Sequence, residues 1–270
     1  VARGGGSCCG AGEPGSGLGG QAKTNWKQSS GLGYSQEELE ALPEGADLGL
    51  GCGSPVGKAD PQPGEVVLDL GSGAGIDCFL AAKRVGPTGM ALGVDMTPEM
   101  LARARENARK TGTANVEFRL GEIEHLPVET ASVDVVISNC VLNLVPSKAQ
   151  AFSEIARVLK PGGRMVVSDV VKLRDLPSHL TMDPALYCAC LGGAIGKEEY
   201  LSLLAEAGLE QVEVLSEQDA TELFLDTPGP VSDWLRGLSK EDTQGLAASI
   251  TVRAVRRGAA ACHRGDTCCD

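Results

Sequence analysis

From Glu65 to Val171, short apolar runs alternate with segments of helical character. The apolar runs predict buried strands at Val66–Leu70, Met90–Asp95, Val116–Leu120, Val133–Asn139 and Arg164–Val171. Helices are predicted between them, over Asp77–Val85, Pro98–Thr111 and Lys148–Leu159. Strands that alternate with helices form right-handed βαβ units, so the chain is predicted to be a doubly wound α/β protein with a mostly parallel sheet.

The flanking regions follow other patterns. Ser35 can cap a short helix over Tyr34–Leu42, with Glu38 completing a capping box, and the glycine-rich sequence GLGCGSP at Gly49–Pro55 is predicted to be a loop. A later helix over Lys197–Ala207 precedes two strands that are expected to form an antiparallel pair, Val212–Leu215 and Ser249–Val255. We therefore predict a flexible N-terminal segment with a cysteine-bearing lid (1–60), a ligand-binding α/β domain (61–172), an insertion with closing strands (173–258) and a cysteine-rich tail (259–270).

The first predicted strand ends in a turn that suits a nucleotide-like ligand. The sequence VVLDLGSGAG at Val66–Gly75 places Asp69 before glycines 71, 73 and 75. Glycine allows a tight turn and a close approach of ligand to backbone, and the next helix offers unpaired N–H groups. Asp95 ends the second strand, where a carboxylate can accept hydrogen bonds from both hydroxyls of a ribose.

Dinucleotide-binding folds use a similar turn and acid, so other motifs must decide the cofactor. GEIEHLP (Gly121–Pro127) follows the third strand, VDVVISNCVLNL (Val133–Leu144) forms the fourth strand and its exit, and a KPGGR turn (Lys160–Arg164) ends the next helix. Together with the Gly-x-Gly-x-Gly spacing, they resemble the class I S-adenosylmethionine methyltransferases over about residues 64–215. The resemblance implies a Rossmann-like sheet with an antiparallel last strand, and S-adenosylmethionine as co-substrate.

The resemblance implies a role for each matching residue. The residues that would line the methionine moiety are Asp69, Gly71, Ser72, Gly73 and Gly75. Asp95 would hold the ribose, and Met96 would pack on the adenine. Glu122 and Ile123 would contact the adenine edge, and Asn139 would flank the sulfonium. Alternatively, Asp69 and Asp95 only cap loops.

The charge and the lengths of the apolar runs exclude some classes of binding partner. A net charge of -12 argues against nucleic acid and anionic membranes, and no apolar run approaches the ~20 residues that cross a bilayer. Without a recognisable signal peptide, a cytoplasmic protein is expected. Its ten cysteines lie in a long α/β sequence rather than a short secreted one, so they are expected to be reduced thiols with a chemical role. The three histidines are scattered and give no zinc-finger spacing, which argues against a structural zinc site.

Three cysteines far apart in the sequence are expected to converge. Cys140 ends the fourth strand, at the edge where open α/β sheets bind ligands, Cys52 lies in the glycine-rich loop, and Cys190 lies in the insertion after the fifth strand. Thiolates prefer soft, thiophilic ions. Trivalent arsenic takes three sulfur ligands and keeps a lone pair that can attack a methyl group without a general base.

At this point the resemblance narrows to the arsenite methyltransferases. The matching motifs are GYSQEELEALPEGADLGLGCGSP, LGEIEHLPV, ISNCVLNLVP and LYCACLGGAIGKEEYL, within about Gly33–Leu215. The resemblance implies that Cys52, Cys140 and Cys190 are essential, and that Cys8 or Cys9 can form a disulfide with Cys52. It also implies stepwise methylation to mono-, di- and sometimes trimethylated arsenicals, with arsenite or its glutathione conjugate as substrate and thioredoxin or glutathione as reductant.

The N-terminus departs from that family, because nothing before Cys8 matches its usual tyrosine-bearing segment. Cys78, on the first helix, is expected to be a packing residue. Cys188 stands where many members of that family have a small residue, and it is either an extra thiol or a packing residue. The tail cysteines either take up arsenic or another soft metal or belong to a disordered remnant, and they are Cys262, Cys268 and Cys269. Two other functions remain open: a methyltransferase with an organic acceptor, and a thiol protein that sequesters metalloids without turnover. Antimonite or selenite could also replace arsenite.

Overall fold

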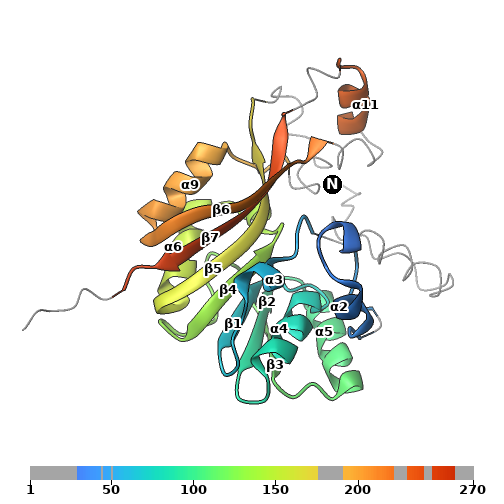
Figure 1. The fold of residues 1–270 in the computed structure, drawn as a ribbon, viewed down its shortest axis with the longest axis vertical. Helices are drawn as coiled ribbons and strands as arrows, with labels where there is room; N and C mark the ends of the chain where they lie inside the picture. The colour runs from blue at the N-terminus through green and yellow to red at the C-terminus, as the bar shows by residue number, and fades with distance from the viewer. Residues whose placement is uncertain are drawn as a thin grey trace, which may run out of the picture.

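The computed structural model describes residues 29–43, 45–49, 51–175, 191–221, 230–239 and 245–258. Its centre is a seven-stranded sheet of order β3-β2-β1-β4-β5-β7-β6 (Figure 1). The strands are β1 Val66–Leu70, β2 Met90–Asp95, β3 Val116–Leu120, β4 Val133–Asn139, β5 Leu159–Lys172, β6 Leu209–Asp219 and β7 Ala247–Arg256. Strands β1 to β5 are parallel, and β7 pairs antiparallel with both β5 and β6. The predicted fold class is confirmed.

The strand order reverses between β1 and β4, which are hydrogen-bonded neighbours. From β1 the chain runs outward to β2 and β3, then returns to β4 and continues to β5 in the other direction. In open α/β sheets, ligands bind beyond the carboxyl ends of the strands at such a reversal. The residues that follow β1 and β4 are therefore the first place to look for a site.

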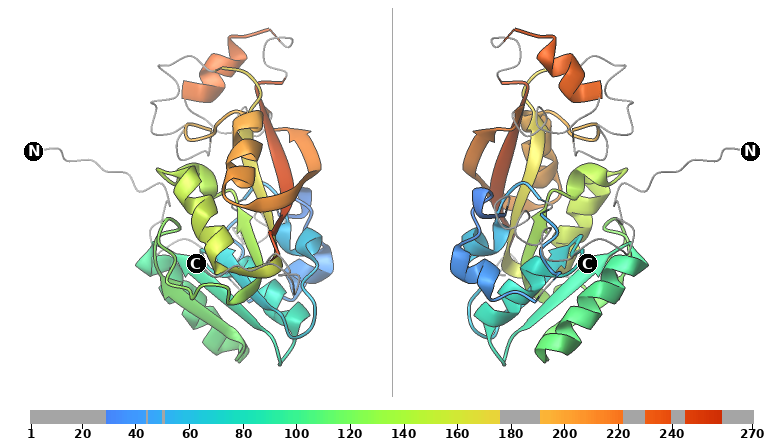
Figure 2. Two further views of the ribbon diagram at one scale, coloured as in Figure 1. Left: turned by 90° about the vertical axis from the view of Figure 1, so that its left-hand side faces the viewer. Right: turned by 90° about the vertical axis from the view of Figure 1, so that its right-hand side faces the viewer.

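Helices cover both faces of the sheet. The helical elements are α2 Gln36–Glu40, α3 Pro55–Ala59, α4 Ile76–Val85, α5 Pro98–Thr111, the 3-10 turn η1 Leu142–Leu144, α6 Lys148–Val158, α9 Lys197–Glu206 and α11 Pro230–Arg236. Helix α11 lies beyond the ends of the strands rather than on a face of the sheet (Figure 1). Helix α6 and the α2–α3 segment lie on opposite faces (Figure 2). Within the described ranges, no helix combines the length and the apolar character needed to cross a membrane.

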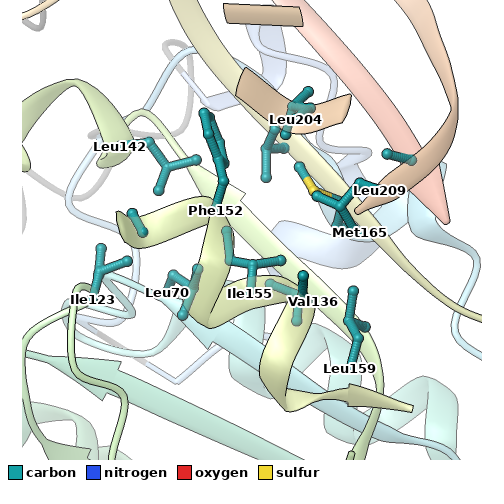
Figure 3. Packing of buried hydrophobic residues seen from close by; sticks show 14 of the residues in the cluster. Leu70, Ile123, Val136, Leu142, Phe152, Ile155, Leu159, Met165, Leu204 and Leu209 are labelled. Carbon is teal, nitrogen blue, oxygen red and sulfur yellow. The ribbon is translucent and has the colours of Figure 1, made fainter. Parts of the chain in front are cut away.

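The central strands β1, β2, β4 and β5 contribute alternate side chains to two separate cores. Val136 and Met165 pack with Phe152 of α6 (Figure 3), whereas Val135 and Val166 pack on the side of α3 and α4. Both faces are buried, which explains why the strands are continuous apolar runs rather than alternating ones.

The structure corrects three details of the predicted elements. The KPGGR sequence is not a turn outside the sheet, because β5 already begins at Leu159. It forms an irregularity in the pairing with β4, where Val133 pairs with Leu159 but Val135 pairs with Arg164. Pro55 begins a short helix, α3, that was not predicted. Strands β6 and β7 are also longer than their apolar centres indicated. The capping box of Ser35 and Glu38 is confirmed.

Candidate functional site

The turn after β1 is folded against the end of β2. Gly71, Gly73 and Gly75 have φ values of 69°, 52° and 97°, in the left-handed region that favours glycine. The amides of Gly71 and Ser72 donate to the carbonyl oxygen of Val94 at 2.8 and 3.1 Å. The turn therefore has a fixed shape at the point where the strand order reverses.

Asp95 connects this turn to the end of β2. Its carboxylate accepts hydrogen bonds from the amide of Gly73 at 2.9 Å and that of Thr97 at 2.8 Å. Met96 beside it is 70% exposed, and Leu120, paired with Asp95 across β3, is 55% exposed. A carboxylate flanked by exposed apolar side chains suits a ligand that joins hydroxyl groups to a flat apolar ring.

The loop after β3 has one exposed and one buried candidate residue. Glu122 is exposed and forms an isolated β-bridge with His125. Ile123 points into the core beside Leu70 and Leu142 (Figure 3). At this edge, a ligand can therefore meet Ile123 through its backbone rather than its side chain.

Two buried carboxylates lie behind the glycine turn. Burial, and then the charge of Asp77, raises the pKa of Asp69 well above its usual value. Burial likewise raises the pKa of Asp77 to about 7. The hydroxyl of Tyr34 donates to the Asp77 carboxylate at 2.9 Å, and Cys78 donates to Asp69 at 3.4 Å. Behind the turn, each of the two carboxyl groups therefore either carries a negative charge or holds a proton.

A cationic ligand fits this arrangement. Among the described residues, neither Asp69 nor Asp77 joins an ion pair. The buried hydroxyl oxygen of Ser72, in the same turn, also has no hydrogen-bond partner there. Buried polar groups normally have partners. An ammonium group and a carboxylate of one ligand would satisfy both kinds of group.

Asn139, the last residue of β4, binds the loop that contains Cys52. Its side-chain oxygen accepts from the amide of Cys52 at 2.9 Å. Its side-chain nitrogen donates to the carbonyl oxygen of Gly53 at 2.6 Å and to the hydroxyl oxygen of Tyr34 at 3.0 Å. One amide group thus fixes the glycine-rich loop to the carboxyl end of the sheet.

Replacing Gly51 with alanine is expected to displace this loop. A Cβ there would lie 2.7 Å from the side-chain nitrogen of Asn139, and Gly51 has a φ of 128°. We expect a loss of about 1–3 kcal/mol in unfolding free energy and faster alkylation of Cys52, which is only 8% exposed. Alkylation is measured by mass spectrometry of the Cys52 peptide. Gly57→Ala is the control, because its Cβ would approach nothing closer than 3.8 Å. Equal alkylation rates in both variants would contradict the argument.

Cys52 and Cys140 meet in one apolar cluster at the carboxyl end of β5. We call it the edge cluster, and its other members are Val170, Leu191, Ala194, Ala220, Trp234, Leu235, Leu238, Leu246 and Ala247. Cys140 has a φ of 59°, and its amide donates to the carbonyl oxygen of Ser168 at 2.7 Å. The structure therefore brings together two of the three cysteines that were expected to converge.

The other predicted thiols lie outside the described residues, namely Cys8, Cys9, Cys188, Cys190, Cys262, Cys268 and Cys269. Leu191, which follows Cys190 in the sequence, belongs to the edge cluster. Within the described ranges, no three His, Cys, Asp or Glu side chains gather as a metal site would require. Cys78 is fully buried on α4, in agreement with a packing role.

Comparison with known proteins identifies the family. A family model described as a methyltransferase domain matches residues 61–208. The chain is 50% identical over 237 residues to an arsenite methyltransferase of Halobacterium salinarum, covering 87% of this chain and 59% of the relative. A solved arsenic(III) S-adenosylmethionine methyltransferase from Chlamydomonas reinhardtii is 34% identical with a TM-score of 0.66, covering 85% of this chain and 73% of that one. The chain belongs to the arsenite methyltransferase family.

The chain spans less than two thirds of the length of each curated arsenite methyltransferase that it matches here. A more distant structure has the same fold. It is a phosphoethanolamine N-methyltransferase of Haemonchus contortus in complex with S-adenosyl-L-methionine, at 20% identity and a TM-score of 0.62, covering 79% of this chain and 54% of that one. Class I methyltransferase architecture is thus shared beyond the arsenite methyltransferase family.

Asp169 and Tyr200 are buried polar residues near the thiols that the sequence analysis missed. Burial, followed by the charges of Asp169, Cys52 and Cys140, raises the pKa of Tyr200. Its hydroxyl donates to Asp169 at 3.4 Å. The sequence signal for Asp169 was an acidic residue inside an apolar strand, and the signal for Asp77 was an acidic residue at the start of an apolar helix. The tyrosines that bind these acids could not be inferred, because Tyr200 is 31 residues from Asp169 and Tyr34 is 43 residues from Asp77.

Asp169→Asn is expected to stabilise the protein at neutral and alkaline pH. Burial raises the pKa of Asp169 to about 7, against the opposing effects of the Val170 amide, the charge of Lys148 and the Tyr200 hydroxyl. The folded chain therefore binds this proton more tightly than the unfolded chain, and wild-type stability falls as pH rises from about 4 to about 7. The variant lacks this loss, which is on the order of 2–4 kcal/mol.

Urea unfolding at about pH 4.5 and about pH 8 measures this effect. The advantage of the variant should be small at the lower pH and largest at the higher one. A constant difference between variant and wild type would show that Asp169 does not titrate in this window.

Proposed function

We propose that this chain contains the part of an arsenite methyltransferase that transfers the methyl group of S-adenosylmethionine to trivalent arsenic held by thiolates. The observation that carries the proposal is the position of Cys52 and Cys140 in one cluster at the carboxyl edge of the sheet. Family membership supports the same acceptor. Mono- and dimethylated arsenicals are the expected products, and trimethylated ones can follow by a further cycle.

The geometry of the glycine turn supports S-adenosylmethionine as the methyl donor. When bound, it supplies a methyl group on a positively charged sulfur. Asp69 and Asp77 would balance the charge of its methionine portion, and the amides of the turn would hold the carboxylate. Asp95 would accept from the ribose hydroxyls, with Met96 on the adenine face. The remaining expected contacts are Gly71, Ser72, Gly73 and Gly75 with the methionine portion, Glu122 and the backbone of Ile123 with the adenine edge, and Asn139 near the sulfonium.

On the acceptor side, Cys52, Cys140 and Cys190 would bind arsenic as thiolates. Thiolate ligation leaves the arsenic lone pair directed at the methyl group, and alignment of the two accounts for most of the acceleration. No side chain needs to remove a proton from arsenic, which has none. The sequence position of Cys190 beside Leu191 of the edge cluster supports its inclusion.

A redox step would restore the trivalent state of the product. Methylation formally oxidises arsenic by two electrons, and two thiols that become a disulfide return two electrons and release two protons. We assign this step to Cys52 with Cys8 or Cys9. Thioredoxin or glutathione would then reduce the disulfide. We place the reaction in the cytoplasm, since it requires thiols that stay reduced.

Arsenic speciation tests the function. The purified chain is incubated with S-adenosylmethionine, arsenite and glutathione, and the products are separated by chromatography with mass detection. Methylarsenicals formed together with S-adenosylhomocysteine are expected. Tight arsenite binding without S-adenosylhomocysteine would instead identify a sequestering protein. Intact cofactor binding with no methylated arsenic would indicate an organic acceptor.

A further inference from the structure

A large cavity lies beside the glycine-rich loop, on the face of the sheet away from α6. Its volume is about 870 Å³, and its walls come from the α2–α3 segment, α4, β6 and β7. Figure 2 shows the α2–α3 segment beside β6 and β7 on this face. Small-molecule sites have volumes of about 300–1,000 Å³. The cavity therefore has the size of a ligand site, and neither the glycine turn nor Cys140 lines it.

The cavity wall contains more cationic side chains than the ion pairs of the described residues neutralise. Lys58, Lys83 and Arg84 line it, and Arg84 pairs with Glu38 at 2.8 Å. Lys58 donates to the hydroxyl oxygens of Ser216 at 2.5 Å and Thr251 at 2.9 Å. In the part of the chain that the structure describes, neither Lys58 nor Lys83 joins an ion pair. Ammonium groups without carboxylate partners in a cavity favour an anionic ligand.

Cys52 connects the cavity to the thiols. It forms part of the cavity wall and also belongs to the edge cluster with Cys140. Its carbonyl oxygen accepts from the hydroxyl of Ser249, another wall residue, at 2.8 Å. Glu37, also on the wall, supplies a carboxylate for an ammonium group. A ligand with several carboxylates, one ammonium group and a sulfur atom matches this combination.

We propose that the cavity binds a small acidic thiol of the amino-acid or peptide type, which carries arsenic to Cys52. The inference rests on the proposed function, and it adds the carrier's binding site. Lys58 and Lys83 hold the carboxylates of the carrier, while its sulfur–arsenic bond faces the wall that contains Cys52. A bond from arsenic to the Cys52 sulfur forms as the bond to the carrier sulfur breaks. The thiol proton of Cys52 passes to the departing carrier thiolate, and arsenic stays trivalent, so no electrons are transferred.

Direct binding tests the site without methylation. S-methylglutathione, which cannot ligate arsenic through a thiolate or exchange with a cysteine, is titrated calorimetrically into the full chain. The double variant Lys58→Met, Lys83→Met is expected to raise its Kd about tenfold or more, because charge-assisted hydrogen bonds are lost. The single variant Lys83→Met should also raise the Kd. Lys83 is exposed on α4, so this variant should fold even if the double variant does not because Lys58 is needed for folding. Lys110→Met, on α5 away from the cavity, should leave the Kd unchanged.

Carrier selectivity provides the second measurement. With glutathione as the only thiol, the variants should require more arsenite for half-maximal methylation, whereas with uncharged 2-mercaptoethanol they should match the wild type. The proposal is overturned if the wild type does not bind S-methylglutathione, if the variants bind it as well as the wild type does, or if both thiols are affected equally. Absence of methylarsenicals with every thiol, with S-methylglutathione binding intact, would instead refute the proposed function.

Discussion

Replacing Cys140 with serine is expected to reduce arsenite methylation at least a hundredfold while leaving the affinity for S-adenosylmethionine within about twofold. Oxygen is a hard ligand and does not replace a thiolate on a soft ion. A loss of alignment by about 1 Å alone costs about a hundredfold in rate. Cys140 directly follows β4 and packs in the edge cluster, whereas the buried carboxylates Asp69 and Asp77 belong to β1 and α4. Methylarsenicals and the cofactor Kd are measured on the same preparation.

Cys78→Ser is the matched control for this substitution. Cys78 is fully buried on α4, and its thiol donates to Asp69 at 3.4 Å. Serine there should lower the unfolding free energy by about 1 kcal/mol and preserve arsenic methylation per folded molecule. If Cys140→Ser kept most of the activity and Cys78→Ser did not, the acceptor site would have to be placed elsewhere.

Asp95→Ala is expected to weaken S-adenosylmethionine binding by about a hundredfold or more. Each hydrogen bond to a charged group contributes about 1.5–3 kcal/mol, and a ribose would make two with this carboxylate. The substitution also removes the acceptor of the Gly73 and Thr97 amides, so the glycine turn loses an anchor. Calorimetric titration of the cofactor gives the Kd, and circular dichroism confirms that the variant is folded.

Asp134→Ala separates this effect from a general loss of stability. Asp134 lies near the amino end of β4, whereas Asp95 is the last residue of β2. Asp134 pairs with Lys160 at 2.8 Å and accepts from the Val66 amide at 2.9 Å. Its replacement should lower the unfolding free energy without changing the cofactor Kd. Similar losses of affinity in both variants would mean that Asp95 acts through the stability of the sheet.

Much of the sheet could be predicted because its strands are buried on both faces. Such strands are uninterrupted apolar runs, and Val133–Asn139 was predicted with the bounds that the structure has. The prediction failed where hydrogen bonding between strands overrides the turn preference of local residues. In KPGGR, proline and glycine indicate a turn, yet the segment is a bulge within β5, because Leu159 before it and Arg164 at its end both pair with β4.

The candidate site was predictable in its motifs but not in its contacts. The glycine turn and the acid that ends β2 are each recognised from a few consecutive residues. The bonds of Asn139 to Cys52 and Tyr34 join residues 87 and 105 positions apart. No local pattern indicates such pairs, and the same holds for the cavity, whose walls come from four separate parts of the chain.

The side-chain amide of Asn139 has a thermodynamic consequence. Through Tyr34 it is connected to Asp77 behind the glycine turn, and through the backbone of Cys52 and Gly53 it is connected to the thiols. A ligand that orders one side of this amide lowers the entropy cost of ordering the other. Methyl donor and arsenic should therefore bind cooperatively, and by linkage each must raise the affinity for the other by the same factor.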